Sequence, residues 1–191
     1  TYDLMNEKAE KIPAGCYGMF CTFSDVMNYI SWKHAAPTFT NFALDPEKCN
    51  RYTFYRAIME NSAMVTKGNM ELVTSVTGKA PTEIIFASGA SKSPLWCQIV
   101  SDVLNIPVHV PKVKEATALG AAILAGKGVG IYSDIAETVK KVVRIERTYY
   151  PNAENAAIYA GLYDNWRSVY AAQLKLADQN LTRNMWSAPG V

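Results

Sequence analysis

The sequence predicts an α/β fold, in which short strands alternate with helices around one sheet. Residues 82–87 form an apolar run rich in β-formers, and a helical apolar pattern over 92–104 follows after the small residues 88–91. A second short strand over 105–111 leads into a second helix over 115–127, which Gly126 and Gly128 would end. In such folds ligands sit beyond the carboxyl ends of the strands, so we expect a ligand near residues 88–93.

The turn between the first of these strands and its helix is suited to an anion. Gly89 has no Cβ atom, so the backbone there can approach a ligand closely. The first amides of a helix lack partners within it, and the helix dipole adds about half a positive charge beside them. A phosphate is the ligand this arrangement favours, while an ordinary tight turn is the alternative.

The chain before this unit is predicted to start with a helical segment over 1–11 and a strand over 15–23. A long helix from Asn50 to about Val76 follows, with Asp45 as its cap and Gly78 at its end. Its predicted buried face consists of the apolar residues Phe54, Ile58, Val65, Leu72 and Val76.

Two charged residues of the long helix, Arg56 and Glu60, are spaced i, i+4 and are able to pair. On an exposed face such a pair contributes only a few tenths of a kcal/mol. We interpret the pair as architectural and not catalytic.

The last part of the chain is predicted to contain a short helix over 133–139 capped by Ser133, an extended segment over 142–149, and a helix of almost thirty residues that begins near Pro151. Aromatic residues recur along that final helix, namely Tyr159, Tyr163, Trp166 and Tyr170. They suit packing against the sheet of the same domain, which we favour, or docking of a partner protein. Residues 179–191 show no periodicity and are expected to be frayed.

Composition is that of a cytoplasmic domain with one core. The chain has 191 residues, of which 19% are charged, with a formal net charge of +2, and this balance predicts no nucleic-acid or membrane partner. No apolar run approaches 18 residues. The four cysteines lack metal-ligand spacing, so reduced structural thiols are expected.

Neither histidine predicts a metal or catalytic site. His34 and Lys33 have the residue types of a catalytic pair, but a solvated surface pair is the favoured interpretation. His109 lies in the apolar strand over 105–111 and is expected at the edge of the core. Neither has partners at metal-ligand spacing.

Several blocks resemble the carboxyl-terminal domain of the FGGY carbohydrate kinases, the family of glycerol, xylulose, ribulose and gluconate kinases. The blocks, in chain order, are residues 41–44, 56–60, 88–102, 106–108, 115–125 and 128–130. Their order and spacing are more specific than any one glycine pattern. The resemblance covers nearly all of the chain, but only about the last third of a family member.

This resemblance implies a ribonuclease-H-like domain of the actin and hexokinase type, the carboxyl-terminal portion of a two-domain kinase. Residues 1–179 would form the ATP-side domain without its first strands, and residues 180–191 a carboxyl-terminal tail. The start of the chain suggests a fragment or a cleaved product.

The resemblance further implies ATP, bound with Mg²⁺, as phosphoryl donor. The acceptor implied by overall likeness is autoinducer-2 (4,5-dihydroxypentane-2,3-dione), a quorum-sensing signal, which would bind mainly to the missing amino-terminal domain. The positions that match the nucleotide loop are Ser88, Gly89, Ala90, Ser91, Lys92 and Ser93. No position matches the family's general-base aspartate, and Asp102 and Asp134 are excluded by their places in a packed helix and at a helix start. The fragment alone is therefore expected to be inactive.

The sequence departs from the family pattern at two places, and two other functions are alternatives to an autoinducer-2 kinase. Ser88 stands where the family usually has a glycine, and residues 32–37 depart from a G-E-R-x-P-type loop near the domain cleft. A pentulose or other polyol kinase is one alternative function. A non-catalytic nucleotide-binding or protein-docking domain is the other, and a phosphocarrier of the sugar phosphotransferase system would be a possible partner on the final helix.

Overall fold

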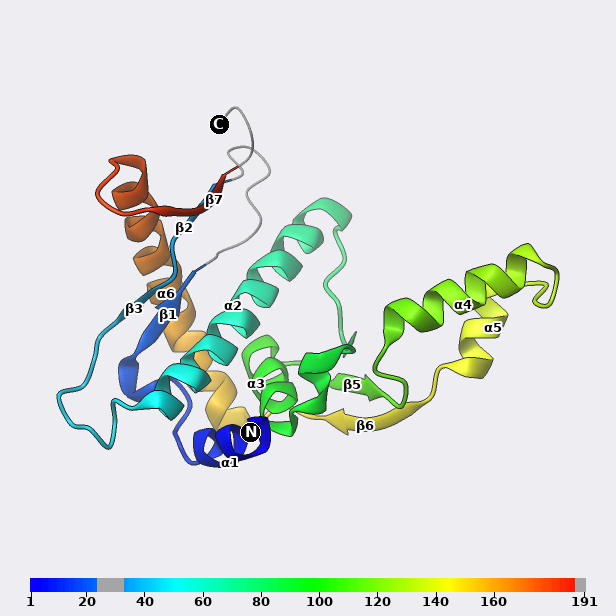
Figure 1. The fold of residues 1–191 in the computed structure, drawn as a ribbon, viewed down its shortest axis with the longest axis horizontal. Helices are drawn as coiled ribbons and strands as arrows, with labels where there is room; N and C mark the ends of the chain where they lie inside the picture. Colours follow the sequence, from blue (N-terminus) through cyan, green and yellow to red (C-terminus); the bar gives the residue numbers. More distant parts are fainter. Residues whose placement is uncertain (24–32, 188–191) are drawn as a thin grey trace.

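The computed structural model describes residues 1–23 and 33–187, and shows long helices packed together beside a small mixed sheet (Figure 1). The helices are α1 (Tyr2–Glu10), η1 (Cys16–Gly18), α2 (Arg51–Thr77), η2 (Gly89–Lys92), α3 (Pro94–Leu104), α4 (Ala116–Gly128), α5 (Ile135–Val142) and α6 (Ala153–Asp178). The strands are β1 (Phe20–Thr22), β2 (Lys33–Ala35), β3 (Thr38–Thr40), β4 (Ile84–Ile85), β5 (Val108–Pro111), β6 (Ile145–Tyr149) and β7 (Asn184–Ser187). The alternation of strands and helices over residues 84–128 is the predicted one.

The largest sheet among the described residues has the order β4-β5-β6. Strands β4 and β5 are parallel, with Ile84 opposite Val108, and β6 returns antiparallel with Tyr149 opposite the same valine. Strand β4 is shorter than the predicted apolar run, and Ile85 is exposed rather than buried. The prediction of a buried strand is therefore wrong for Ile85.

The main core lies where α2, α3 and α6 meet. Its buried members include Met59, Ala63, Met64, Cys97, Ile99, Val100, Val103, Val108, Tyr159, Tyr163 and Trp166. The aromatic residues of α6 thus pack inside their own domain, as the favoured interpretation expected. Since Tyr163 and Trp166 are buried, the alternative interpretation of α6 as a docking face is wrong for these side chains.

Helix α2 has the predicted length, but it buries a different face. Ile58 and Val76 are exposed, while Arg56, Glu60 and Asn61 are buried. The cap is Asn50, whose side chain accepts from the amides of Tyr52 and Thr53. Asp45 instead accepts from the Glu47 amide in the preceding turn, so its predicted role as the helix cap is wrong.

The burial of α2 is explained by a polar network centred on Glu60. Its Oε1 accepts from Arg56 Nε at 2.8 Å, from the Tyr159 hydroxyl at 2.8 Å and from the Gly15 amide at 3.1 Å. Arg56 also donates to the Ala9 carbonyl at 3.2 Å. Burial opposes the charge of Arg56, but Tyr159 and Glu60 favour it and hold its pKa above the ordinary value. The pair is architectural, as predicted, but it is buried rather than exposed.

A second buried carboxylate, Asp102, joins α3 to the start of α6. It accepts from Gln98 Nε2 at 2.7 Å, from the Asn152 amide at 2.8 Å and from Asn155 Nδ2 at 2.8 Å. Its place in a packed helix, which excluded it as a catalytic base, is confirmed.

Two other elements differ from expectation. The short helix α5 starts later than predicted, because Asp134 and not Ser133 caps it by accepting from the Glu137 amide at 2.8 Å. In the segment expected to be frayed, β7 pairs antiparallel with β2, so that Trp186 lies opposite His34. Residues 24–32, part of the predicted segment before Pro37, lie outside the described residues.

The cysteines agree with the prediction of reduced thiols. Cys16, Cys21, Cys49 and Cys97 are free, and burial raises the pKa of Cys21 to about 12. Within the described ranges, no helix combines the length and the apolar character needed to cross a bilayer.

Replacing Glu60 with alanine is expected to lower the free energy of unfolding by about 3–5 kcal/mol, because the buried guanidinium of Arg56 loses its charge partner. Urea denaturation followed by circular dichroism measures this change. The control is Glu7→Ala, which removes an exposed i, i+4 pair with Lys11 at 3.8 Å and should change stability by less than about 1 kcal/mol. Equal losses in the two variants would contradict a structural role for the buried network.

Candidate functional site

The turn after β4 leaves two of its backbone amides without a partner inside the turn. Residues 89–92 form the 3-10 turn η2, and α3 begins at Pro94, later than predicted, because proline is favoured at the first helical position and Ser93 caps the helix. The amides of Ser91 and Ser93 bond within the turn, to the carbonyls of Ser88 and Ala90. The first amides of η2, at Gly89 and Ala90, have no acceptor within that turn.

Ser88 has a strained backbone. Its φ of 92° and ψ of −175° lie in a region that is essentially restricted to glycine. The Ser88 amide donates to the Lys114 carbonyl at 2.8 Å, which holds this conformation between β4 and the start of α4. The strain gives a physical reason for the glycine that the family usually has at this position.

A hollow of about 760 Å³ opens beside this turn, and we call it the loop hollow. It is lined by Thr1, Tyr2, Asp3, Asn6, Tyr55, Ile58, Met59, Gly89, Ala90, Lys92, Ser93 and Trp96. A Cβ atom added at Gly89 would meet no protein atom within 4 Å, so the missing side chain leaves open space. The volume is in the usual range of small-molecule sites, about 300–1,000 Å³.

One wall of the loop hollow is a hydrogen-bonded cluster from three elements. Asn6 Oδ1 accepts from the Tyr55 hydroxyl and from Ser93 Oγ, each at 3.1 Å. Ser93 Oγ in turn accepts from the Trp96 amide at 3.2 Å, which caps α3. Burial and the nearby Tyr2 raise the pKa of Tyr55, so its hydroxyl remains a donor at neutral pH. Since Asn6 Oδ1 is engaged, its amide nitrogen is the group left to donate to a ligand.

The other walls supply apolar surface and a positive charge. The residues with apolar side-chain surface that line the hollow include Tyr2, Tyr55, Ile58 and Trp96, and such surface suits a planar ring. Lys92 is exposed and lies 3.5 Å from Glu115 Oε1, an ion pair that leaves the ammonium accessible to an anion.

The predicted loop residues divide into two groups. Gly89, Ala90, Lys92 and Ser93 line the loop hollow. Ser88 and Ser91 do not, and Ser91 is buried with its hydroxyl donating to the Ser88 carbonyl at 2.7 Å. Their assignment to nucleotide binding stays a prediction for all six residues.

Three residues at the loop hollow were not predicted as site residues, namely Asn6, Tyr55 and Trp96. Asn6 and Tyr55 belong to α1 and α2, far from the loop in the chain, and no local motif marks them. Trp96 is one helical turn after Ser93, so its spacing could have placed it at the same site.

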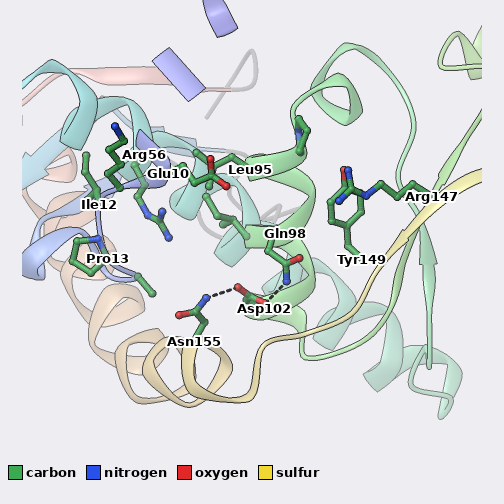
Figure 2. A pocket seen from close by; sticks show the side chains of 14 residues that line it. Glu10, Ile12, Pro13, Arg56, Leu95, Gln98, Asp102, Arg147, Tyr149 and Asn155 are labelled. Carbon is green, nitrogen blue, oxygen red and sulfur yellow. Dashed lines mark hydrogen bonds between the residues drawn. The ribbon is translucent and has the colours of Figure 1, made fainter. Parts of the chain in front are cut away.

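A second hollow of about 440 Å³ lies against another face of α3 (Figure 2). Figure 2 shows Gln98 and Asn155 directed toward Asp102, the pairing described above. Arg147 lies over the ring of Tyr149, 4.7 Å from its centroid. This second hollow is lined by no residue of the predicted loop. Its buried charged residues, Arg56 and Asp102, already have hydrogen-bond partners in the protein. The loop hollow is therefore the better candidate site.

The histidines have the surroundings of structural residues. His109 Nδ1 is 2.8 Å from Thr148 Oγ1 and Nε2 is 3.0 Å from Glu83 Oε2, as expected for a residue at the edge of the core. Lys33 pairs with Asp178 at 2.6 Å and not with a neighbouring catalytic group. In the ranges that the structure describes, no three His, Cys, Asp or Glu side chains are grouped to hold a metal ion.

Comparisons with known proteins agree with the sequence resemblance. The C-terminal domain model of the FGGY family of carbohydrate kinases matches residues 1–129. Autoinducer-2 kinases of Yersinia enterocolitica and Photorhabdus laumondii are 49% and 47% identical to the chain over 191 residues, which is all of this chain but 36% of each relative.

Solved structures show the same fold. Xylulose kinase from Rhodospirillum rubrum matches with a TM-score of 0.72 and 26% identity, over 92% of this chain and 34% of that one. Plasmodium falciparum glycerol kinase matches with a TM-score of 0.67 and 19% identity, over 89% of this chain and 34% of that one. The predicted ribonuclease-H-like α/β class is confirmed by these neighbours. The chain belongs to the FGGY family of carbohydrate kinases, whose carboxyl-terminal domain it carries.

Proposed function

We propose that the chain is the ATP-side part of a kinase that transfers the γ-phosphate of ATP to a hydroxyl of autoinducer-2. The observation that carries this proposal is the loop hollow beside Gly89, at the carboxyl end of β4, where ligands of α/β folds bind. The preference for autoinducer-2 over a pentulose is supported by 49% identity along the whole chain to an autoinducer-2 kinase. Identity to the xylulose kinase structure is 26%.

In the proposed complex, the apolar surface of Ile58 and Trp96 would hold the purine ring, and the Asn6 amide would donate to a ring nitrogen. The open amides of Gly89 and Ala90, together with Lys92, would face the phosphates. Backbone amides that bind an anion without moving contribute to catalysis because phosphoryl transfer depends mainly on positioning and charge stabilisation.

The magnesium ion is proposed to reach the site with ATP, held through the phosphate oxygens. The donor set of the loop hollow fits this arrangement, since Asp3 is the single carboxylate among its lining residues. When bound, Mg²⁺ offsets negative charge on the phosphates. The general-base aspartate and the acceptor site are assigned to the rest of the kinase, which spans most of the length of the relatives. We place the kinase in the cytoplasm, which the four free thiols support.

The aromatic side chains that suggested a phosphocarrier partner, Tyr163 and Trp166, are buried and support no such contact. We therefore do not include it in the proposal.

The proposal is tested with the complete kinase that carries this sequence. ADP release is measured by a coupled assay with ATP and autoinducer-2, D-xylulose or D-ribulose as acceptor. We expect kcat/KM for autoinducer-2 to exceed those for both pentuloses by at least about tenfold. A higher kcat/KM for a pentulose would mean that the pentulose, and not autoinducer-2, is the acceptor. The enzymatic proposal would be overturned by the absence of ATP-dependent transfer to all three acceptors.

Substitution of Gly89 by valine is expected to weaken ATP binding at least about tenfold, because it adds a branched side chain to a residue that lines the loop hollow. Stability should change little, since a Cβ atom there meets no protein atom within 4 Å. Isothermal titration of the 191-residue chain with ATP measures the affinity. Gly161→Val in α6 is the control, because a Cβ atom at Gly161 also meets nothing within 4 Å. Equal ATP affinity in the two variants would contradict the placement of the nucleotide.

Removal of the Asn6 amide in Asn6→Ala is expected to weaken ATP binding by about five- to tenfold, the loss of roughly one hydrogen bond. The same variant should discriminate less between ATP and GTP, because the acceptor proposed for the Asn6 amide is N1 of adenine, and N1 of guanine carries a proton and cannot accept. Titrations with both nucleotides measure this, and Asn184→Ala in β7 is the control. An unchanged ratio of the two affinities would show that Asn6 does not read the base.

Exchange of Ser88 for glycine is expected to raise the free energy of unfolding by about 1 kcal/mol, because the strained backbone is relieved. The urea midpoint of the 191-residue chain checks this. Ser91→Gly should be destabilising instead, since its buried hydroxyl holds the turn. A lower midpoint for Ser88→Gly would contradict the backbone strain.

A further inference from the structure

The second hollow, of about 440 Å³, is a polar cavity that the proposed function does not use. Its volume lies within the usual range of small-molecule sites, about 300–1,000 Å³. It is lined by residues of α1, α2, α3, β6 and α6, so its shape depends on the packing of most of the domain. It shares no lining residue with the loop hollow.

Arg147 of β6 brings an unpaired positive charge to the second hollow. Its guanidinium lies 4.7 Å from the centroid of the Tyr149 ring. Within the part of the chain that the structure describes, Arg147 forms no ion pair with a carboxylate, whereas Arg56 at the same hollow lies 2.8 Å from Glu60. A planar guanidinium packed on an aromatic ring keeps the N–H groups along its edge, where they match the oxygens of a carboxylate or a phosphate.

Arg56 lines the hollow with donors that the protein does not fully use. It is 5% exposed. A guanidinium has five N–H groups. Three of them donate among the described residues, from Nε to Glu60 and from the two terminal nitrogens to the Ala9 carbonyl and the Tyr159 hydroxyl. Two N–H groups of a buried cation are therefore left for a bound molecule.

Two amide side chains add acceptors to the same hollow. Gln98 Nε2 and Asn155 Nδ2 donate to Asp102 at 2.7 and 2.8 Å. Their carbonyl oxygens are left to accept, and hydroxyl groups of a ligand can donate to them. Figure 2 shows Arg147 and Arg56 well apart, with Gln98 between them, so a ligand that contacts all three is elongated.

Two carboxylates also line the second hollow, but neither blocks an anion at Arg147. Asp102 is 2% exposed, and its two oxygens already accept three N–H groups. Glu10 is exposed and stands next to Lys11, a lining residue of opposite charge. Arg147 is thus the charge that a ligand meets without a fixed counterion.

We propose that the second hollow is an accessory binding site for a small polyhydroxylated molecule that carries one phosphate or carboxylate group. The oxyanion binds Arg147. The hydroxyl groups bind Gln98, Asn155 and the unused N–H groups of Arg56. This site goes beyond the proposed function and does not depend on it, because the nucleotide is assigned to the other hollow.

The test is isothermal titration of the 191-residue chain with D-ribose 5-phosphate, D-gluconate and D-ribose. We expect at least one of the two anions to bind with a dissociation constant of about 1 mM or less, and at least about tenfold more tightly than uncharged D-ribose. The anion that binds more tightly identifies the group as a phosphate or a carboxylate. The absence of saturable binding by both anions, or equal binding of D-ribose, would overturn the proposal.

Variants decide which hollow holds the anion. Arg147→Gln is expected to weaken its binding at least about fivefold, and Arg147→Lys to weaken it less, because lysine keeps the charge but lacks the planar fork. Arg147 is exposed, so both variants should keep the melting temperature within about 2 °C. The control is Arg144→Gln, an exposed arginine outside the lining, which should not change the affinity.

Gly89→Val should also leave the affinity for the anion unchanged, although it is expected to weaken ATP binding. Anion binding that is lost in Gly89→Val and kept in Arg147→Gln would place the anion in the loop hollow and refute the accessory site. Anion binding that depends on Arg147 would retain the accessory site even if Gly89→Val had no effect on ATP, an outcome that counts only against the placement of the nucleotide.

Discussion

The placement of α1 against the rest of the domain depends on one buried carboxylate. Glu60 Oε1 accepts hydrogen bonds from Arg56 of α2, from Tyr159 of α6 and from Gly15 in the turn after α1. Arg56 also donates to the Ala9 carbonyl at the end of α1. Hydrogen bonds to charged groups are stronger than neutral ones, and buried charges tolerate few alternative arrangements. Since Asn6 lies on α1, the same network sets the position of one wall of the loop hollow.

The candidate site therefore combines a local and a non-local part. The local part is the turn from Ser88 to Ser93, whose conformation is set by Ser93 as a cap, Pro94 at the helix start and the tie from Ser88 to Lys114. The non-local part is brought by α1 and α2, which contribute Asn6 and Tyr55. A nucleotide in the hollow would contact both, so its affinity would report the packing of α1 as well as the shape of the turn.

This division also explains what could be predicted from the sequence. The unit over residues 82–128, and four of the loop residues that line the hollow, follow from apolar periodicity and from the family blocks. The buried face of α2 could not be predicted from the sequence. The burial of Arg56 and Glu60 depends on hydrogen bonds to Tyr159 and Gly15, which are distant in the chain. Strand β7 was missed for the same reason, since its partner is β2. Asn6 carries no motif, so only the packing of α1 places it at the site.

The hydroxyl of Ser93 serves two purposes at once, capping α3 and supporting Asn6. Any replacement must both accept from a helix amide and reach across to α1. Asparagine resembles serine in its capping strength, can meet the first demand and adds an amide of its own. A change to alanine would remove both hydrogen bonds, and would loosen the helix start and this wall of the hollow together.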